Sequence, residues 1–390
     1  MIKIQSKATQ SEIEVGRYIG KFEADPKLPS VVVFGGIHGN EPSGVFALQV
    51  VCDHIIKNEI KINGSFYAIS GNMCALPKGK RYCETDLNRI WTHQHLDVLK
   101  VDPIGEDELP SEYLQMKEIM NEIEYIIARN KGPIYFIDLH TTSSQSCPFI
   151  PINDTLANRA FAMKFPVPIV LGIEEFIEGP LLSYINEIDH VCLGFEGGQH
   201  DDKKSIQHQI AFVSLSLLYA NLITKIEFPD YLEYLNALQQ ACKEEKGVYE
   251  ILYKYELKQD DHFCMLPGFK SFDRIAKNQR LAEHNGKMVC SKEEGKIFMP
   301  LYQSQGEDGF FIIRSVSQFW LLLSAKLRQF RMEKFLICLP GVSRDIKNPK
   351  ALRIDKNTAR FLAKEIFHLL GFRMKKKENN VLIFTRRERI

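Results

Sequence analysis

The sequence predicts an α/β fold: a mostly parallel or mixed sheet flanked by helices, followed by a small β domain and a C-terminal α+β extension. Two observations lead to this prediction. Up to residue 246, short apolar segments alternate with amphipathic helical patterns, which is typical of strand–helix–strand crossovers. From residue 247, the apolar segments become short, alternating and rich in turns, which indicates the strands of a β unit.

The first 246 residues contain the strands and helices of the main sheet. The apolar segment 31–34 is predicted to be a buried strand, and Pro42 and Ser43 then open a helical pattern that extends through Ile55. The other expected strands are residues 13–22, 65–70, 134–139, 167–171 and 190–195, and the other expected helices are residues 111–127, 154–164, 180–188, 203–223 and 230–242. Residues 97–110 are acidic and contain prolines, so we expect a surface loop there.

The last third of the chain divides into two smaller units. We expect short strands within residues 247–272 and at residues 289, 297–299 and 310–313, and then a helix to about 331, a strand over 335–339, a helix over 357–370 and a hairpin over 371–385. The chain is therefore expected to comprise a main α/β domain (1–246), a small β domain (247–317) and a basic α+β extension (318–390).

Composition and charge narrow the class of protein. The 390 residues are 45% hydrophobic and 25% charged, as in ordinary globular proteins of two or three domains. The formal net charge of +1 argues against a wholly basic nucleic-acid-binding protein, and no apolar run approaches the ~20 residues of a membrane span. The N-terminus does not resemble a signal peptide and the 9 cysteines show no paired spacing, so we expect reduced thiols in a cytoplasmic protein.

The segment after the first buried strand carries two potential metal ligands, His38 and Glu41. Three glycines in it, Gly35, Gly36 and Gly39, allow backbone angles that other residues avoid, so a tight loop can direct both side chains to one point. An imidazole and a carboxylate suit zinc, and three protein ligands with an open fourth position form the catalytic arrangement. By itself, however, His-x-x-Glu is more often a helix cap followed by a first-turn acid.

Two further expected strands end on polar residues that are able to do chemistry. His140 closes one and Glu196 closes the other, and in open α/β sheets ligands bind outside the carboxyl ends of the strands. His38, Glu41 and His140 would then form a His₂Glu zinc site with an open position for water. Glu196 would be the general base for that water. Asp138 either orients a ligand or is a strand-end cap or surface acid, and the sequence favours neither interpretation.

The motif Asp86-Leu87-Asn88-Arg89, with Arg81 upstream, suggests an anion-binding loop. Arginine presents a planar fork that grips carboxylates bidentately, and asparagine can add an amide donor beside it. Taken alone, a loop arginine paired with Asp86 would be the better interpretation. Next to a metal site, Arg81, Asn88 and Arg89 become candidates for substrate binding.

Taken together, these motifs resemble those of the succinylglutamate desuccinylase and aspartoacylase family, which is related to carboxypeptidase-A-like zinc peptidases. The resemblance rests, in chain order, on His38-Gly39-Asn40-Glu41, Arg81-Tyr82, Asp86-Leu87-Asn88-Arg89, Asp138-Leu139-His140 and Glu196, and continues at Met265-Leu266-Pro267-Gly268-Phe269 and Met299-Pro300-Leu301-Tyr302-Gln303. It covers the first two-thirds of the chain and part of the β domain, and it ends at about Ser317. It implies a zinc carboxypeptidase-like fold for the main domain.

The resemblance also implies a reaction, which is hydrolysis of the amide bond of a small, anionic N-acyl amino acid. The roles it implies are one Zn²⁺ per chain held by His38, Glu41 and His140, a catalytic base at Glu196, and substrate-anion binding by Arg81, Asn88 and Arg89. The β domain would cap the site.

The chain departs from the family at one position. Some members place a tyrosine from the C-terminal domain near the substrate, whereas here Phe310 and Phe311 follow Gly309. Tyr302 is the candidate that could substitute for that tyrosine.

Three alternatives remain open from the sequence. One is a metallocarboxypeptidase on the same fold, although a capping β domain suits small acyl amino acids better than peptide chains. Another is a non-enzymatic binding protein with a vestigial metal site, which the complete set of candidate residues argues against. The third is phosphate binding by the basic residues 375–377. Charge runs are commonly only solvated, so no nucleic acid or membrane partner is expected, and a homo-oligomer is compatible with the sequence.

Overall fold

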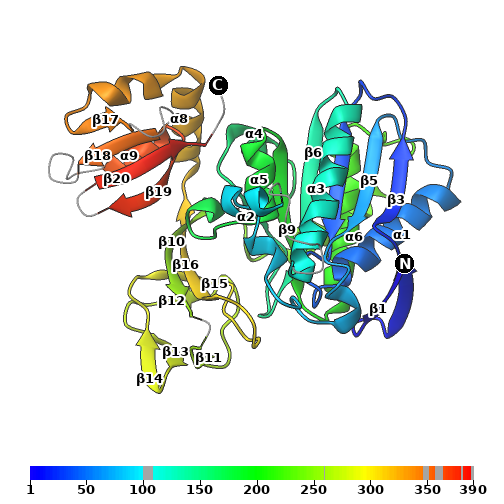
Figure 1. Cartoon of the computed structure of the whole chain (residues 1–390), viewed down its shortest axis with the longest axis horizontal. Helices are drawn as coiled ribbons and strands as arrows, with labels where there is room; N and C mark the ends of the chain where they lie inside the picture. The colour runs from blue at the N-terminus through cyan, green and yellow to red at the C-terminus, as the bar shows by residue number, and fades with distance from the viewer. Residues whose placement is uncertain (100–108, 259, 346–350, 356–362, 379–380, 388–390) are drawn as a thin grey trace.

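The computed structural model describes residues 1–99, 109–258, 260–345, 351–355, 363–378 and 381–387. Figure 1 shows three parts: the main α/β domain, a yellow β region beside it, and an orange and red C-terminal extension. The fold class expected from the sequence is confirmed, because helices flank a mixed sheet and a β-rich region follows. Within the described residues, no helix is long and apolar enough to cross a membrane.

The main sheet has five strands in the order β3-β5-β4-β6-β9. Four of them run parallel, and β3 joins the edge antiparallel to β5. The strands are β3 (Tyr18–Glu23), β4 (Ser30–Gly35), β5 (Ser65–Ser70), β6 (Ile134–Thr142) and β9 (Val191–Gln199). The single strand expected over residues 13–22 is instead divided into two. Strand β2 (Ser11–Val15) pairs with β1 (Ile2–Ser6), and Gly16 and Arg17 lie outside any strand before β3 begins.

Helices cover both faces of this sheet. The helices of the domain are α1 (Ser43–Lys57), α2 (His93–Val98), α3 (Ser111–Arg129), α4 (Leu156–Ala162), α5 (Leu181–Glu187), α6 (Lys203–Tyr219) and α7 (Tyr231–Ala241). Helix α2 occupies the start of the segment expected to be a loop at 97–110, and most of the rest of that segment lies outside the described residues.

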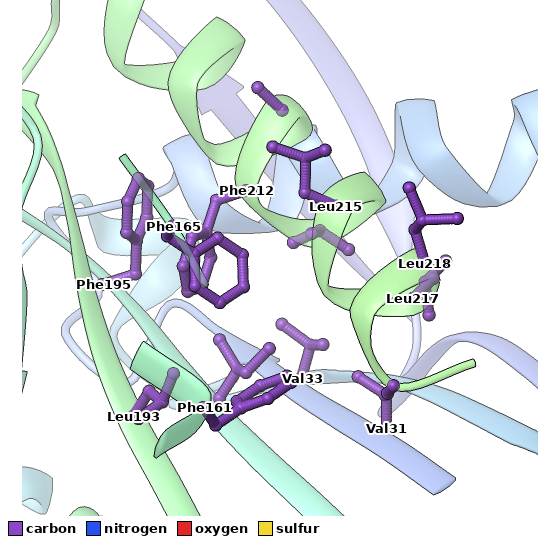
Figure 2. Close-up of a cluster of buried hydrophobic side chains, with 14 of the residues drawn as sticks. Val31, Val33, Phe161, Phe165, Leu193, Phe195, Phe212, Leu215, Leu217 and Leu218 are labelled. Atoms are coloured by element: carbon purple, nitrogen blue, oxygen red, sulfur yellow. The ribbon is translucent and has the colours of Figure 1, made fainter. Parts of the chain in front are cut away.

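Strand β4 shows why the central strand is an unbroken apolar run. Its side chains alternate between faces: Val31 and Val33 join one buried cluster with residues of α1 and α6, whereas Val32 and Phe34 join another with residues of α3. Figure 2 shows the first cluster, in which the ring of Phe212 from α6 stacks on a phenylalanine of β9 at a centroid distance of 3.9 Å. Burial on both faces holds the strand ends, and the residues that follow them, in fixed positions.

A second sheet joins the main domain to the β region. Its order is β12-β15-β16-β10-β8-β7, and β10 (Val248–Glu256) pairs in parallel with β8 (Ile169–Leu171) and antiparallel with β16 (Asp308–Val316). The other strands are β7 (Ile150–Ile152), β12 (Arg274–Ile275) and β15 (Gly295–Phe298). Strand β7 was not expected because it has three residues and contains Pro151, which is tolerated since β7 lies at the edge of the sheet.

The rest of the β region is a three-stranded sheet. It consists of β11 (Phe263–Met265), β13 (Arg280–His284) and β14 (Lys287–Cys290), with β13 in the middle. A buried cluster that includes Leu281, Ile297 and Phe310 gives the region apolar packing of its own. The six-stranded sheet and the three-stranded sheet therefore continue the fold from the main domain into the β region.

The C-terminal extension is an α+β unit, as expected. It contains α8 (Gln318–Gln329), a 3₁₀ helix η5 (Met332–Cys338), β17 (Val342–Arg344), β18 (Ala351–Asp355), α9 (Ala363–Leu369), β19 (Phe372–Glu378) and β20 (Val381–Arg386). The hairpin expected over 371–385 is confirmed as the antiparallel pair β19–β20. Part of the helix expected over 357–370, and the side chains of residues 375–377, lie outside the described residues.

One expectation for the extension is wrong: residues 335–339 do not form a strand. Residues 335–338 belong to η5 and Leu339 follows it directly; the buried side chains of η5 are Glu333 and Leu336. This spacing of three matches a 3₁₀ helix, whose side chains eclipse at i and i+3, and not the alternation of a strand. Arg331 precedes the helix in a left-handed conformation with φ of 53°, which turns the chain into it.

Buried charges connect the extension to the main domain. Arg328 and Arg387 of the extension both contact the carboxylate of Asp154, and Arg387 Nε lies 3.0 Å from Glu174 Oε1. We call this group the Asp154 cluster; it consists of Asp154, Glu174, Glu175, Arg159, Arg328 and Arg387. It thus contains three carboxylates and three guanidiniums.

Candidate active site

The parallel strands β4, β6 and β9 end at one edge of the main sheet, and the candidate residues gather there. His140 on β6 lies directly beside Glu196 on β9 in the strand register. His38 and Glu41 lie in the segment between β4 and α1. The sheet topology therefore brings together the four residues that the sequence placed at separate strand ends.

Two glycines allow the loop after β4 to take its path. Gly36 has φ of 76°, a left-handed angle that most side chains avoid. At Gly39 a Cβ atom would lie 2.3 Å from the backbone carbon of Ala75, and the amide of Gly39 donates to the carbonyl of Arg81 at 3.1 Å. The loop is thereby held against the segment that carries the candidate arginine.

His38, Glu41 and His140 converge around one carboxylate. His38 Nδ1 lies 2.9 Å from Glu41 Oε1, and His140 Nδ1 lies 3.1 Å from Glu41 Oε2. One ligand atom from each residue lies within 4.8 Å of the others, and all three side chains are buried. Ligands about 2.0–2.1 Å from a tetrahedral zinc ion are roughly 3.4 Å apart, so this spacing and this mixture of nitrogen and oxygen donors fit zinc.

The second nitrogen of each histidine faces its own carboxylate. His140 Nε2 lies 2.8 Å from Asp138 Oδ2, and His38 Nε2 lies 3.2 Å from Asp86 Oδ1. Such pairs fix the ring orientation and the tautomer of metal-binding histidines. Asp138 thus makes the contact with His140 that an orienting residue would make, and Asp86 makes the equivalent contact with His38.

The contact of Asp86 with His38 was missed because the sequence suggested Asp86 only as a partner for an arginine. Its carboxylate does hold Arg81 Nε at 2.9 Å, but it also accepts from the backbone amide of Asn88 at 2.9 Å. This second bond caps the 3₁₀ helix η2 (Leu87–Arg89). Asp is a favoured residue at the start of a helix, so the position of Asp86 two residues before Asn88 was a signal of this cap in the sequence.

Glu196 is buried beside the three candidate ligands, and its Oε2 atom has no hydrogen-bond partner. Burial raises the pKa of this carboxyl to about 8; Glu41 and Asp138 act in the same direction, and His140 opposes them. A buried carboxyl group with an unpartnered oxygen and a raised pKa is the kind of group that accepts and donates protons in a catalytic site.

The site holds an excess of negative charge. We call it the active-site cluster; it consists of His38, Glu41, Arg81, Asp86, Asp138, His140 and Glu196. Four of its members are carboxylates and one is a guanidinium, whereas the two histidines are neutral unless protonated. Burial alone would raise the pKa of Glu41, but the two imidazoles lower it well below the usual value, and Asp138 and Glu41 raise the pKa of His140 against the effect of burial. A divalent cation would offset this excess.

A cavity of about 130 Å³ opens over the active-site cluster. The main domain lines it with the candidate residues and with apolar side chains such as Ile173, Ile177 and Leu182. The β region contributes Met299, Leu301, Gln303, Gly306, Glu307, Asp308 and Phe311. Part of the cavity wall therefore comes from residues after 246.

Arg81, Asn88 and Arg89 all line this cavity, but the structure gives them different surroundings. Arg89 donates to Asp308 Oδ2 at 2.9 Å and to the carbonyl of Asn88 at 3.0 Å. The Asn88 amide oxygen accepts from the backbone of Leu181 at 2.9 Å, while its nitrogen lies 3.4 Å from His140 Nε2. Arg89 thus pairs with an aspartate of the β region and not with Asp86.

Tyr302 does not line the cavity. It is 40% exposed, and its hydroxyl donates to the carbonyl of Leu266 at 2.7 Å and accepts from the amide of Phe269 at 3.1 Å. Phe311 lines the cavity instead. In this structure, then, the Tyr302 hydroxyl is bonded within the β region and lies away from the candidate ligands.

His200 lines the cavity and was missed by sequence reasoning. Its Nδ1 lies 2.7 Å from Thr141 Oγ1, and its Nε2 lies 3.0 Å from Gln303 Oε1. Gln303 also accepts a hydrogen bond from Asn40 at 3.0 Å. A series of hydrogen bonds therefore connects the β region, the end of β9 and the loop that carries His38 and Glu41, which we call the metal loop. The position of His200 immediately after β9 was the signal that could have found it.

Comparison with known proteins agrees with this geometry. A family model described as "Succinylglutamate desuccinylase/Aspartoacylase catalytic domain" matches residues 27–209, which include every member of the active-site cluster. Residues 27–209 are thus similar to the catalytic domain of the succinylglutamate desuccinylase/aspartoacylase family. The resemblance inferred from the motifs is therefore confirmed for the catalytic domain.

Relatives and solved structures extend the comparison. Aspartoacylase of Rattus norvegicus is 31% identical over 173 residues, which is 41% of this chain and 51% of the relative. Succinylglutamate desuccinylase of Burkholderia thailandensis is 24% identical over 119 residues, 30% of this chain and 32% of the relative. The matches thus span about half or less of these relatives. A succinylglutamate desuccinylase/aspartoacylase structure from Rhodobacter sphaeroides, at 14% identity, covers 75% of this chain and 87% of that one with a TM-score of 0.52, which shows the fold.

Proposed function

We propose that this protein is a zinc-dependent hydrolase that cleaves the amide bond of a small N-acyl amino acid. The observation that carries the proposal is the convergence of His38, Glu41 and His140 within 4.8 Å beside the unpartnered carboxyl oxygen of Glu196. The family match supports it, because the relatives bear the names aspartoacylase and succinylglutamate desuccinylase.

His38, Glu41 and His140 are the residues that would hold the zinc ion. When bound, zinc supplies a Lewis acid and a positive charge that lower the pKa of nearby water and of acidic groups. Glu196 then accepts a proton from water at Oε2, its unpartnered oxygen, and delivers it to the leaving amine nitrogen. Asp86 and Asp138 keep the two imidazoles in place during this reaction.

Arg89 is proposed to bind a substrate carboxylate next to the scissile amide. Its guanidinium is already paired with Asp308, whose other oxygen lies 2.8 Å from Lys254 Nζ. Because Lys254 remains on Asp308, Arg89 can turn part of its fork to an incoming carboxylate without leaving Asp308 alone. Arg81, which lies 3.8 Å from Glu41, is placed closer to the metal loop and suits the oxyanion that develops at the carbonyl.

The wall of the cavity supports a small substrate. The β region closes one side of it with Met299, Leu301 and Phe311. A polypeptide substrate would need an open channel past this wall, so the arrangement favours an acyl amino acid over the metallocarboxypeptidase alternative.

The test is a hydrolysis screen of N-acyl amino acids and of peptides with a free C-terminus, using the full chain loaded with zinc and the Glu196→Gln variant as control. We expect turnover of at least one N-acyl amino acid by the wild type and loss of it in the variant. Turnover of peptides alone would favour the carboxypeptidase. Zinc binding without turnover of either class would favour a binding protein.

A double cycle tests Arg89 itself. The free acid and the amidated form of an accepted substrate are compared with wild type and Arg89→Lys. Because a hydrogen bond to a charged group is worth roughly 1.5–3 kcal/mol, each single change should lower kcat/KM about ten- to a hundredfold. Both changes together should cost less than their sum, since they remove the same contact. Strictly additive losses would show that Arg89 does not bind this carboxylate.

A further inference from the structure

Cys74 and Cys83 form a thiol pair beside the active-site cluster. Their Sγ atoms lie 3.2 Å apart, and both residues are half-buried. Lys78 Nζ lies 3.2 Å from Cys83 Sγ and 3.7 Å from Cys74 Sγ. A second pair, Cys147 and Cys242, is also in hydrogen-bond contact and has Lys246 nearby, but Cys242 is buried, whereas Cys74 and Cys83 are both partly exposed.

Two buried side chains hold this pair in place. The oxygen of Asn72 accepts from the backbone amide of Cys74 at 3.2 Å, and its nitrogen donates to Glu112 Oε1 at 3.2 Å. The same carboxylate oxygen of Glu112 accepts from the backbone amide of Cys83 at 2.7 Å. Both Asn72 and Glu112 are fully buried. The two cysteines therefore face each other because a rigid scaffold positions both backbones, and not through chance contact of flexible loops.

We propose that Cys74 and Cys83 are a redox-active dithiol that a small-molecule disulfide, such as oxidised glutathione, converts to a disulfide within the chain. Closing the bond requires the sulfur atoms to approach from 3.2 Å to about 2.05 Å, a small movement for two side chains. The inference goes beyond the proposed hydrolase activity and does not depend on it.

The exchange proceeds in two balanced steps. The Cys83 thiol loses its proton, and the thiolate attacks one sulfur of the small disulfide; the S–S bond breaks and one small thiolate leaves and takes up a proton. Cys74 then loses its proton and attacks the Cys83 side of the mixed disulfide, which releases the second small thiol. Two protein thiols and one small disulfide thus become one protein disulfide and two small thiols.

Lys78 explains why Cys83 is the attacking residue, since its ammonium group is nearer to Cys83 than to Cys74. Partial burial and the Cys74 thiol keep the pKa of Cys83 above its usual value, and Lys78 offsets only part of this rise. Replacing the lysine by an uncharged side chain of similar length should therefore slow the first step.

The cross-link would act on the substrate side of the cavity. The segment between the two cysteines contains Arg81, whose guanidinium contacts Asp86 and Glu41. Its backbone carbonyl accepts from Gly39 in the metal loop. A disulfide between residues 74 and 83 would close this segment into a short ring and restrain the arginine that faces the metal loop.

The exposed cysteines of the β region provide an internal control. Cys264 lies on β11 and Cys290 on β14, and β13 lies between these strands. Strands are about 4.8 Å apart, and the two cysteines are also offset along β13, opposite Glu283 and Arg280, so they lie more than about twice that distance apart, beyond the reach of a disulfide. They can form mixed disulfides but not a bond to each other.

Peptide mapping of the full chain tests the proposal. The zinc-loaded protein, freed of excess metal, is incubated with oxidised glutathione, blocked with iodoacetamide and digested with trypsin. Trypsin cuts after Lys78, Lys80 and Arg81, so the proposed disulfide joins peptide 62–78 to peptide 82–89. We expect this linked pair as the first disulfide within the chain, with its loss on reduction, and only mixed disulfides at Cys264 and Cys290.

Variants make the result decisive. Cys74→Ser should trap a mixed disulfide on Cys83, and Lys78→Met should slow formation of the linked peptides severalfold. Cys83→Ser should abolish the cross-link and leave Cys74 less reactive than Cys83 is in the other variant. The proposal is overturned if the linked peptides never form while Cys264 is modified, or if Cys74→Ser leaves Cys83 unmodified. Neither outcome depends on whether the protein hydrolyses N-acyl amino acids.

Discussion

The molecule contains two buried clusters of charged side chains that differ in their balance of charge. This difference distinguishes a candidate reactive site from a structural contact between the main domain and the C-terminal extension. The Asp154 cluster matches three carboxylates with three guanidiniums between the main domain and the C-terminal extension. The active-site cluster opposes four carboxylates with the single guanidinium of Arg81. The first cluster is neutral by itself, and the second needs protons or a cation.

The ionisation of one carboxyl in each cluster, Asp154 and Glu196, follows from this balance. Burial alone would raise the pKa of Asp154, but the three surrounding guanidiniums hold it well below the ordinary carboxyl range. Glu196 lacks such partners, and burial raises its pKa to about 8. A buried charge with its counter-charges in place indicates structure, whereas a buried charge whose counter-charge is missing indicates a site for a ligand.

Removing a ligand from the active-site cluster should have the largest effect. We expect His140→Ala to lose stoichiometric zinc and turnover while keeping most of the fold, because catalytic zinc sites seldom carry the folding energy of structural ones. Metal analysis after gel filtration and circular dichroism measure the two properties. The control is His208→Ala, which removes a histidine of α6 that is bonded to the carbonyl of Gly197 on β9; this variant should keep its zinc. Retention of zinc by His140→Ala would remove it from the ligand set.

Glu196→Gln should preserve zinc but lower kcat by about 10²–10⁴-fold, the usual contribution of an acid–base group. The substitution keeps the shape of the side chain and removes its ability to take up a proton. Steady-state kinetics on the substrate found in the screen measure the loss, with Glu187→Gln at the protein surface as control. Turnover near the wild-type level would show that another group moves the proton.

The Asp154 cluster should respond in stability and not in metal content. We expect Asp154→Ala to lower the free energy of unfolding by about 3–5 kcal/mol, because it leaves buried guanidiniums without their counter-charge. Denaturant titration measures this change, and zinc content should stay at the wild-type value. Glu12→Ala, which breaks an exposed pair with Lys3, should change the stability by less than about 1 kcal/mol. Loss of zinc from Asp154→Ala would erase the distinction between the clusters.

The carboxylates that orient the histidines should have a smaller effect. We expect Asp86→Asn to weaken zinc binding about 10–100-fold, since it loses the charge opposite His38 Nε2 and Arg81. Competition with a chelator measures the affinity. Asp53→Asn, in an exposed pair with Gln49 on α1, is the matched control. Unchanged affinity in Asp86→Asn would mean that the contact with His38 does not serve the metal.

The smallest effect is a slope of stability with pH. The folded-state pKa of Glu196 is raised from 4.5 to about 8, so the folded state holds a proton that the unfolded state has lost between these values. The stability that this proton gives is complete below about pH 4.5 and disappears as the pH rises through 8. In chelator-treated protein, the wild type should lose up to about 1.4 kcal/mol per pH unit relative to Glu196→Gln. Parallel curves for the two proteins would contradict the raised pKa.

The convergence of the candidate residues was easier to predict from the sequence than their surroundings. His38 and Glu41 follow an apolar strand, His140 and Glu196 lie toward the carboxyl ends of two others, and the topology of parallel sheets brings such strand ends together. Asp86 and His200 each had a local signal, but their contacts with His38 and Gln303 escaped prediction because these partners lie far away along the chain.

The same limit applies to the fold. The apolar strand at Val31 to Phe34 was predictable because burial on both faces imposes its composition. Strand β7 is short and contains a proline, whereas η5 has apolar residues in a segment that resembles a strand. In both segments the secondary structure is decided by tertiary contacts and not by the local sequence. Asp154 carried no signal in the sequence, because its arginine partners Arg328 and Arg387 lie far away along the chain.

An anomalous-difference map measured at the zinc absorption edge, on crystals of the full-length zinc-loaded protein, tests the central distinction most directly. We expect one peak per chain, bordered by His38 Nδ1, His140 Nδ1 and the carboxylate of Glu41, and no peak at the Asp154 cluster. A map without a peak at the three residues, or with its main peak elsewhere, would contradict the assignment of the active-site cluster as the metal site.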